Sequence, residues 1–142
     1  MEQIKDNKAF RLLSGSFILF IVIFRFSFFV GEGQENFLFH QVIGNFLGYF
    51  TIQSNLLVAV WFLVTAFKNE DNKFYSYLIN RQLNTALLFF ASVTTLLYWI
   101  FIFPYQPMHS MLDLILKSLL HIVLFVALLM DYTLHYLSLI HI

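Results

Sequence analysis

Long apolar stretches separated by short polar breaks dominate the pattern of the chain. Four of them have the roughly 20 mostly apolar residues that a helix needs to cross the hydrocarbon core of a membrane. They cover residues 10–30, 46–67, 83–103 and 111–134. Lipid offers no hydrogen-bond partner to the backbone, so each stretch must satisfy its own polar groups as an α-helix does. The pattern predicts an all-α, polytopic integral membrane helix bundle, with four transmembrane helices in a single domain over residues 1–142.

The breaks between these helices carry loop-forming residues, and their charges predict an orientation. Residues 31–36 are rich in glycine and polar groups, 68–73 are mostly charged or amide side chains, and 104–107 contain both prolines. Positive residues gather before the first helix and between the second and third, whereas the other two loops have none. They are Lys5, Lys8, Arg11, Lys68, Lys73 and Arg81. Because short cytoplasmic loops are enriched in Lys and Arg, we predict a cytoplasmic N-terminus and an outer aromatic belt containing Tyr98, Trp99 and Tyr105.

Composition narrows the classes of function. The chain is 60% hydrophobic and only 11% charged, whereas about a quarter of the residues of a soluble domain are charged. Lys plus Arg and Asp plus Glu number 8 each, so no net positive field would attract nucleic acid. Without cysteine there is no disulfide, no thiolate metal site and no Cys nucleophile. Gly-rich phosphate loops and His-Glu-x-x-His metal motifs are also absent, so we predict no metal and no cofactor.

Several ionisable residues lie inside the predicted helices, where an unpaired charge is costly. Arg25 and Lys117 lie at similar depth below the outer end of their helices, by the 1.5 Å rise per residue. Asp113, Lys117 and His121 follow one another at i, i+4 and i+8, so they share one helix face. One interpretation is a local Asp113–Lys117 pair with Lys117 reaching toward the outer interface. The other is a polar site between helices, with His121 too deep to reach water.

The second predicted helix offers a matching polar stripe. Gly44 and Gly48 form a small-xxx-small pair, and Thr51, Ser54 and Asn55 follow at helical spacing, which predicts close approach of a neighbouring helix. A threonine in such a helix usually bonds the carbonyl four residues earlier. Thr51 nevertheless lies close to the depth of Lys117. A hydroxyl beside a neutral imidazole is the minimum for nucleophilic acyl transfer, so Thr51 and His121 are candidate catalytic residues.

The third helix adds hydroxyl and amide side chains, and none is singled out as an oxyanion donor. They are Asn84, Thr85, Ser92, Thr94 and Thr95.

Two segments together resemble a known family. The run Tyr49-Phe50-Thr51-Ile52-Gln53-Ser54-Asn55-Leu56-Leu57, and Leu119-Leu120-His121 followed by Asp131, are similar to the androgen-induced protein family and its bacterial six-helix relatives. Eukaryotic members are membrane threonine hydrolases that cleave fatty acid esters of hydroxy fatty acids. The resemblance implies Thr51 as nucleophile, His121 as general base, and a bacterial inner membrane location. Phe125 departs from the proline common in relatives, and Asp131 from the glutamate of some members.

Further expectations follow from combining this resemblance with the polar residues. Arg25, Lys117, Asn55 and Asp113 are the predicted substrate-binding residues, with the two cations facing a carboxylate of a lipid substrate. The expected partners are this lipid and the bilayer, and the oligomeric state is left open. The family has about six membrane spans, so this chain is expected to be truncated at its C-terminus. Residues 137–142 look like translated adapter sequence, and no role is expected for His141.

Two other functions fit parts of the pattern. A haem-binding electron carrier would use His121 and His135 of the last helix, but the second and third predicted helices contain no histidine to complete the ligation. A non-catalytic membrane protein, either a small transporter or a subunit of a complex, would use Arg25, Asp113 and Lys117 as a solute path or a subunit contact. Proline occurs only in the 104–107 loop, which argues against the broken helices common in transporters.

Overall fold

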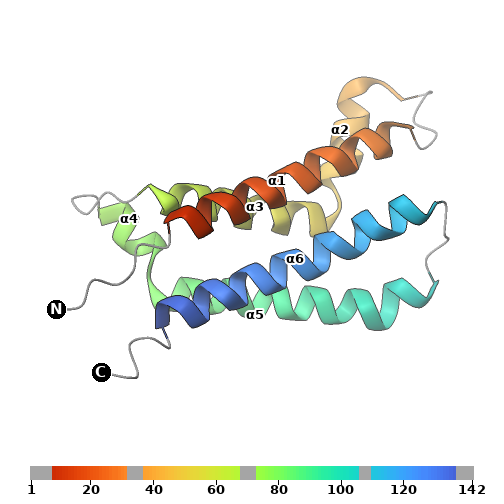
Figure 1. Ribbon diagram of the computed structural model, residues 1–142. Helices are drawn as coiled ribbons and strands as arrows, with labels where there is room; N and C mark the ends of the chain where they lie inside the picture. The colour runs from red at the N-terminus through yellow and green to blue at the C-terminus, as the bar shows by residue number, and fades with distance from the viewer. Residues whose placement is uncertain (1–7, 32–36, 68–72, 106–109, 137–142) are drawn as a thin grey trace.

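The computed structural model describes residues 8–31, 37–67, 73–105 and 110–136, and within them it contains helices and no strand (Figure 1). The elements are α1 (Lys8–Gly31), α2 (Phe39–Leu47), α3 (Phe50–Ala66), α4 (Lys73–Leu78), α5 (Arg81–Leu97), the π-helical segment η1 (Tyr98–Ile102), the 3-10 turn η2 (Phe103–Tyr105) and α6 (Met111–Tyr136). The predicted all-α fold class is confirmed. Residues 137–142, including His141, lie outside the described segments.

The four long helices α1, α3, α5 and α6 lie side by side as a bundle (Figure 1). Helix α1 packs mainly on α3, α5 packs mainly on α6, and contacts between α1 and α6 join the two pairs. The start of α1, helix α4 and the last turn of α6 share one end, which we call the α4 end. Helix α2, η2 and the first turn of α6 lie at the opposite, α2 end. The four long helices therefore run alternately toward one end and the other, as the predicted topology requires.

Three helices are long and apolar enough to cross a membrane, namely Lys8–Gly31, Gln82–Tyr105 and Met111–Leu134. Helices α2 and α3 meet the same requirement only as a pair, and their axes are bent by 81°. Large apolar side chains such as Phe20, Leu57 and Phe89 are more than half exposed on the outside of the bundle, as lipid-facing residues would be. With three to four such helices, the chain fits a multi-pass membrane protein.

The bend marks the main difference from the straight helix predicted over residues 46–67. Helix α2 ends at Leu47, and Tyr49 has an extended backbone with φ −72° and ψ 119°. The Leu47 carbonyl, which a continuous helix would satisfy internally, instead accepts a hydrogen bond of 2.8 Å from the Gln53 side chain. A side chain of α3 thus provides a backbone partner at the break, which makes a break tolerable at membrane depth.

Close helix packing occurs at a different glycine from those predicted. A Cβ added to Gly15 of α1 would lie 2.9 Å from Leu63 Cγ and 3.0 Å from the Ala59 carbonyl oxygen, both on α3. A Cβ on Gly44 would meet nothing within 4 Å, and one on Gly48 would meet only the backbone of its own turn. The predicted packing role of the Gly44–Gly48 pair is therefore wrong, because the bend turns α2 away from the bundle axis. Gly15 allows α1 and α3 to approach.

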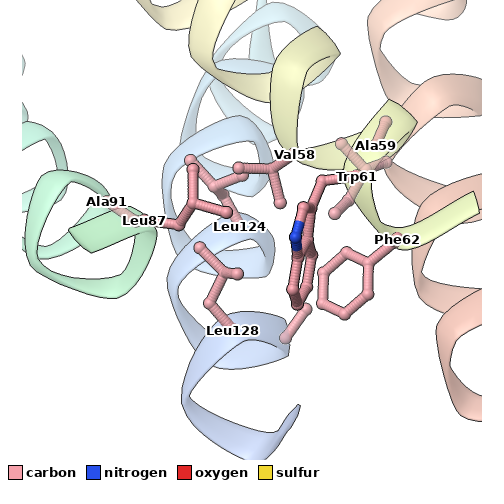
Figure 2. Close-up of a cluster of buried hydrophobic side chains, with 10 residues drawn as sticks. Val58, Ala59, Trp61, Phe62, Leu87, Ala91, Leu124 and Leu128 are labelled. Atoms are coloured by element: carbon pink, nitrogen blue, oxygen red, sulfur yellow. The ribbon is translucent and has the colours of Figure 1, made fainter. Parts of the chain in front are cut away.

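Two apolar clusters form the core. The cluster toward the α4 end joins α3, α5 and α6, with Trp61 and Phe62 packed beside Leu87, Leu124 and Leu128 (Figure 2). The Trp61 indole Nε1 donates a 2.8 Å hydrogen bond to the Leu78 carbonyl, which connects α3 to the end of α4. The second cluster lies toward the α2 end and is built from α1, α2, α3 and α6. Its buried members are Ile21, Val22, Phe29, Val42, Phe46, Ile52, Leu116 and Leu120.

A buried ion pair connects the helices at the α4 end. Arg11 of α1 donates from Nε and Nη2 to the two carboxylate oxygens of Asp131 on α6, at 2.8 and 3.1 Å. Asn84 of α5 donates to the same carboxylate at 3.1 Å, and Arg11 Nη1 lies 3.5 Å from the Thr65 carbonyl of α3. Asp131 is 0% exposed and Arg11 is 6% exposed. Arg11, counted above as a flanking cytoplasmic charge, thus lies inside the bundle.

Candidate functional site

A pocket of about 360 Å³ lies between the helices at the α2 end. Every element that reaches this end except η2 contributes to its wall. The lining residues are Arg25 and Phe29 of α1, Phe46 of α2, Tyr49 at the bend, Thr51 and Ile52 of α3, Tyr98 and Ile102 of η1, and Lys117, Leu120 and His121 of α6. The wall combines apolar side chains with a few polar groups, as small-molecule sites usually do. Four of the predicted site residues, Thr51, His121, Arg25 and Lys117, line this one pocket.

Two cations of the pocket share one carboxylate. Lys117 Nζ lies 2.5 Å from Asp113 Oδ2, which confirms the expected local pair on α6. Arg25 Nη2 reaches across from α1 to 3.3 Å from Asp113 Oδ1, although no hydrogen bond among the described residues satisfies that oxygen. Asp113 itself is 2% exposed and is not part of the wall. Asp113 therefore lies between two cations of the pocket wall, Arg25 from α1 and Lys117 from α6.

The His121 ring is held by stacking. Its ring centroid lies 3.7 Å from that of Tyr98, and the two ring planes are 12° apart. His121 is 5% exposed, and no described residue forms a hydrogen bond with its ring nitrogens, while its backbone carbonyl accepts from the Thr95 hydroxyl at 3.0 Å. An imidazole that lines a pocket and bonds no described residue can bond a ligand or a second side chain.

Tyr98 was assigned above to the lipid-facing aromatic belt, and this assignment is wrong. The residue is only 3% exposed, whereas Tyr105 is 83% exposed. Tyr98 continues the buried face of α5, on which Leu87, Ala91 and Thr94 are buried at the preceding turns. The helix changes from α to π at Tyr98, and single π-helical turns within α-helices occur often at functional sites. Tyr98 was not among the predicted site residues.

Thr51 lies in the first turn of α3 and is half-buried. Other hydroxyls of the bundle bond the carbonyl four residues earlier, as Thr65 does to Trp61 at 2.7 Å and Thr94 to Phe90 at 2.7 Å. The residue four positions before Thr51 belongs to α2, beyond the bend, and in the described residues the Thr51 hydroxyl forms no hydrogen bond. The bend therefore leaves this hydroxyl available in the pocket.

The remaining predicted residues lie elsewhere. Asn55 is 1% exposed and donates from Nδ2 to the Thr51 carbonyl at 2.8 Å, so it positions the first turn of α3 and does not line the pocket. The hydroxyl and amide residues of α5 also lie outside the wall, with Asn84 engaged in the Arg11–Asp131 cluster at the opposite end. The polar or aromatic wall residues missed by the sequence analysis are the aromatic ones, Phe29, Phe46, Tyr49 and Tyr98.

The arrangement bears on the metal and haem alternatives. Among the described residues, no group of three His, Asp or Glu side chains could hold a metal ion. No second histidine lines the pocket beside His121, and the side chain of His135 lies outside what the structure describes.

The chain matches no model of a known protein family, no curated protein and no solved structure. The interpretation of the site therefore depends on its own geometry.

Proposed function

We propose that the chain acts as a membrane-embedded threonine hydrolase of lipid esters. The observation that supports the proposal is the presence of Thr51 and His121 on the wall of one pocket, from two different helices. Neither the Thr51 hydroxyl nor the His121 ring forms a hydrogen bond among the described residues. A hydroxyl and a neutral imidazole in one partly apolar pocket are the pair that acyl transfer requires. The resemblance to the androgen-induced protein family points to the same two residues.

In the proposed reaction, Thr51 Oγ1 attacks the ester carbonyl while a ring nitrogen of His121 takes the hydroxyl proton. The tetrahedral intermediate breaks its bond to the alcohol oxygen, and His121 returns the proton to the leaving alcohol. Water then attacks the acyl-threonine with the same base, which releases the carboxylic acid and restores the hydroxyl. At the start of α3, the backbone N–H groups of Ile52 and Gln53 donate to the Tyr49 carbonyl, so those of Phe50 and Thr51 are the candidate donors to the oxyanion.

The charges on the wall favour a lipid ester that also carries a free carboxylate. Arg25 and Lys117 both line the pocket, so a ligand carboxylate bound there would lie beside two cations. Opposite charges attract strongly where water is excluded, and Arg binds carboxylates well because it presents several donors in one plane. The apolar side chains around them, including Phe29 and Ile52, suit an acyl chain.

The proposal is tested by labelling purified protein in detergent with a fluorophosphonate probe, which reacts with activated hydroxyl nucleophiles. Wild type is compared with Thr51→Ala, Thr51→Ser and His121→Ala. The matched controls are Thr133→Ala and His40→Ala, which change the same residue types outside the pocket. We expect labelling in wild type and both controls, its loss in Thr51→Ala and His121→Ala, and its retention in Thr51→Ser.

A second readout separates a hydrolase from a lipid-binding protein. Binding of a fluorescent fatty acid is measured in the same variants, because the binding cations are intact in Thr51→Ala. Fatty acid binding without probe labelling or ester turnover in wild type would contradict the hydrolase and favour a non-catalytic role for the pocket. Labelling that survives in Thr51→Ala would also contradict the assignment of the nucleophile.

A further inference from the structure

Helix α2 is amphipathic, and only half of its apolar side packs on the bundle. At 100° per residue, Phe39, Ile43 and Leu47 lie along one line, with Val42 and Phe46 beside it. Val42 and Phe46 are each 5% exposed and belong to the core cluster at the α2 end. Phe39 is 71% exposed and Leu47 is 40% exposed. An apolar strip thus continues outward from the core with no described residue covering it.

The other side of α2 is polar and also uncovered. His40, Gln41, Gly44 and Asn45 occupy the remaining arc, and all four are exposed. The helix starts with the Gln41 side chain accepting a 3.0 Å hydrogen bond from the Leu38 backbone N–H, so its first turn is fixed locally. A helix with an apolar strip and a polar strip, both exposed, fits neither bulk water nor the hydrocarbon core.

The orientation of α2 matches the boundary between these two media. It lies beside α1 and α3 at the α2 end of the bundle, and its axis is bent by 81° from that of α3 (Figure 1). With 9 residues at 1.5 Å each, it is far too short to cross a bilayer. When the long helices cross the membrane, α2 must therefore run nearly parallel to its surface.

We infer that α2 is an interfacial helix, whose Phe39–Leu47 strip lies among the lipid acyl chains just below the headgroups while its His40–Asn45 side faces water. The partner is the lipid surface itself, continuous with the lipid-facing side chains of the long helices. Because Phe46 of the same helix lines the pocket, this contact holds one wall of the pocket at headgroup depth. An amphiphile in that leaflet would then meet the polar wall residues without leaving the interface.

The inference is independent of any hydrolase activity and is tested by spin labelling. The chain has no cysteine, so single substitutions give single labelling sites. Nitroxide labels are placed at Phe39→Cys, Leu47→Cys, Gly44→Cys and Asn45→Cys, all exposed positions. The protein is reconstituted in vesicles of phosphatidylcholine and phosphatidylglycerol, and each label is probed for collision with oxygen and with a water-soluble nickel complex. A label at Leu57→Cys, on the exposed side of α3, provides the deep lipid reference.

We expect the ratio of oxygen to nickel accessibility to be several-fold higher at Phe39 and Leu47 than at Gly44 and Asn45, and highest at Leu57. Equal ratios at the four α2 sites, with high nickel accessibility, would mean that α2 projects into water. Equal ratios as high as that at Leu57 would mean that α2 dips into the hydrocarbon. Either result would overturn the inference. Unchanged elution of each labelled protein as a single species controls for folding.

Discussion

Replacing Asp131 by asparagine is expected to destabilise the bundle strongly, because it leaves the Arg11 guanidinium buried without a counter-charge. The carboxylate accepts two bonds from Arg11, at 2.8 and 3.1 Å, and one from Asn84 at 3.1 Å. An asparagine of the same shape retains one acceptor and turns an amide N–H₂ group toward donors. The variant therefore loses the charge and at least one of three hydrogen bonds.

The magnitude follows from the burial of both partners. Hydrogen bonds to charged groups contribute about 1.5–3 kcal/mol each. Removing one partner of a buried pair costs about 3–5 kcal/mol, whereas an exposed pair is worth about 0–1 kcal/mol. Asp131 is fully buried and Arg11 nearly so. We therefore expect Asp131→Asn to lower the free energy of unfolding by about 3–5 kcal/mol.

The assay is reversible unfolding of the purified protein in mixed micelles with increasing SDS, followed by circular dichroism. A double variant, Arg11→Met with Asp131→Leu, is the informative control, since replacing a whole buried pair with apolar groups is often neutral or stabilising. The double variant should be more stable than Arg11→Met alone or Asp131→Leu alone, so the effects of the two substitutions should be far from additive. A loss of less than about 1 kcal/mol in Asp131→Asn, or additive effects in the double variant, would refute the reasoning.

Three further predictions concern packing and the pocket. Gly15→Ala should destabilise the bundle by about 1–3 kcal/mol in the same assay, because the added Cβ would lie 3.0 Å from the Ala59 carbonyl oxygen. Gly44→Ala should be neutral or stabilising by up to about 1 kcal/mol, since a Cβ there meets nothing within 4 Å. Equal effects of the two substitutions would contradict the close approach of α1 and α3 at Gly15. Arg25→Gln should raise KM far more for lipid esters with a free carboxylate than for their methyl esters, and equal effects would exclude a carboxylate contact. Tyr98→Leu should slow probe labelling while Tyr98→Phe retains it, because phenylalanine preserves the ring stacked on His121; equal rates would show that stacking is irrelevant.

The features that the sequence predicted well are those imposed by the solvent or by a single helix. Lipid requires long apolar helices, so the fold class and the last helix, Met111–Tyr136, follow closely from composition. The Asp113–Lys117 pair follows from the i, i+4 spacing alone. Thr51 and His121 came from depth and chemistry, and the structure brings both to one pocket.

The features that the sequence did not predict depend on contacts between distant segments. Arg11 and Asp131 are separated by 120 positions, and neither residue type carries a signal that names its partner. The bend after Leu47 was missed because glycine is common in transmembrane helices, so Gly48 does not distinguish a break from a continuous helix. The close approach at Gly15 escaped for a similar reason, since a single glycine between Ser14 and Ser16 does not by itself name the helix that packs on it. In each case the backbone pattern permits two arrangements, and tertiary packing selects one.

The two ends of the bundle differ in how regular their helices are. At the α4 end, Arg11 and Asn84 both donate to the carboxylate of Asp131, and the Asn84 Oδ1 atom has no hydrogen bond among the described residues. At the α2 end, a π-helical turn and a sharp bend interrupt two helices, and one oxygen of Asp113 lacks a hydrogen bond among the described residues. Local departures from regular structure gather where a protein gives up stability for function. The bend connects these observations, because the same break that sets α2 at 81° to α3 also leaves the Thr51 hydroxyl without a hydrogen bond among the described residues, on the wall of the pocket that Arg25 and Lys117 line.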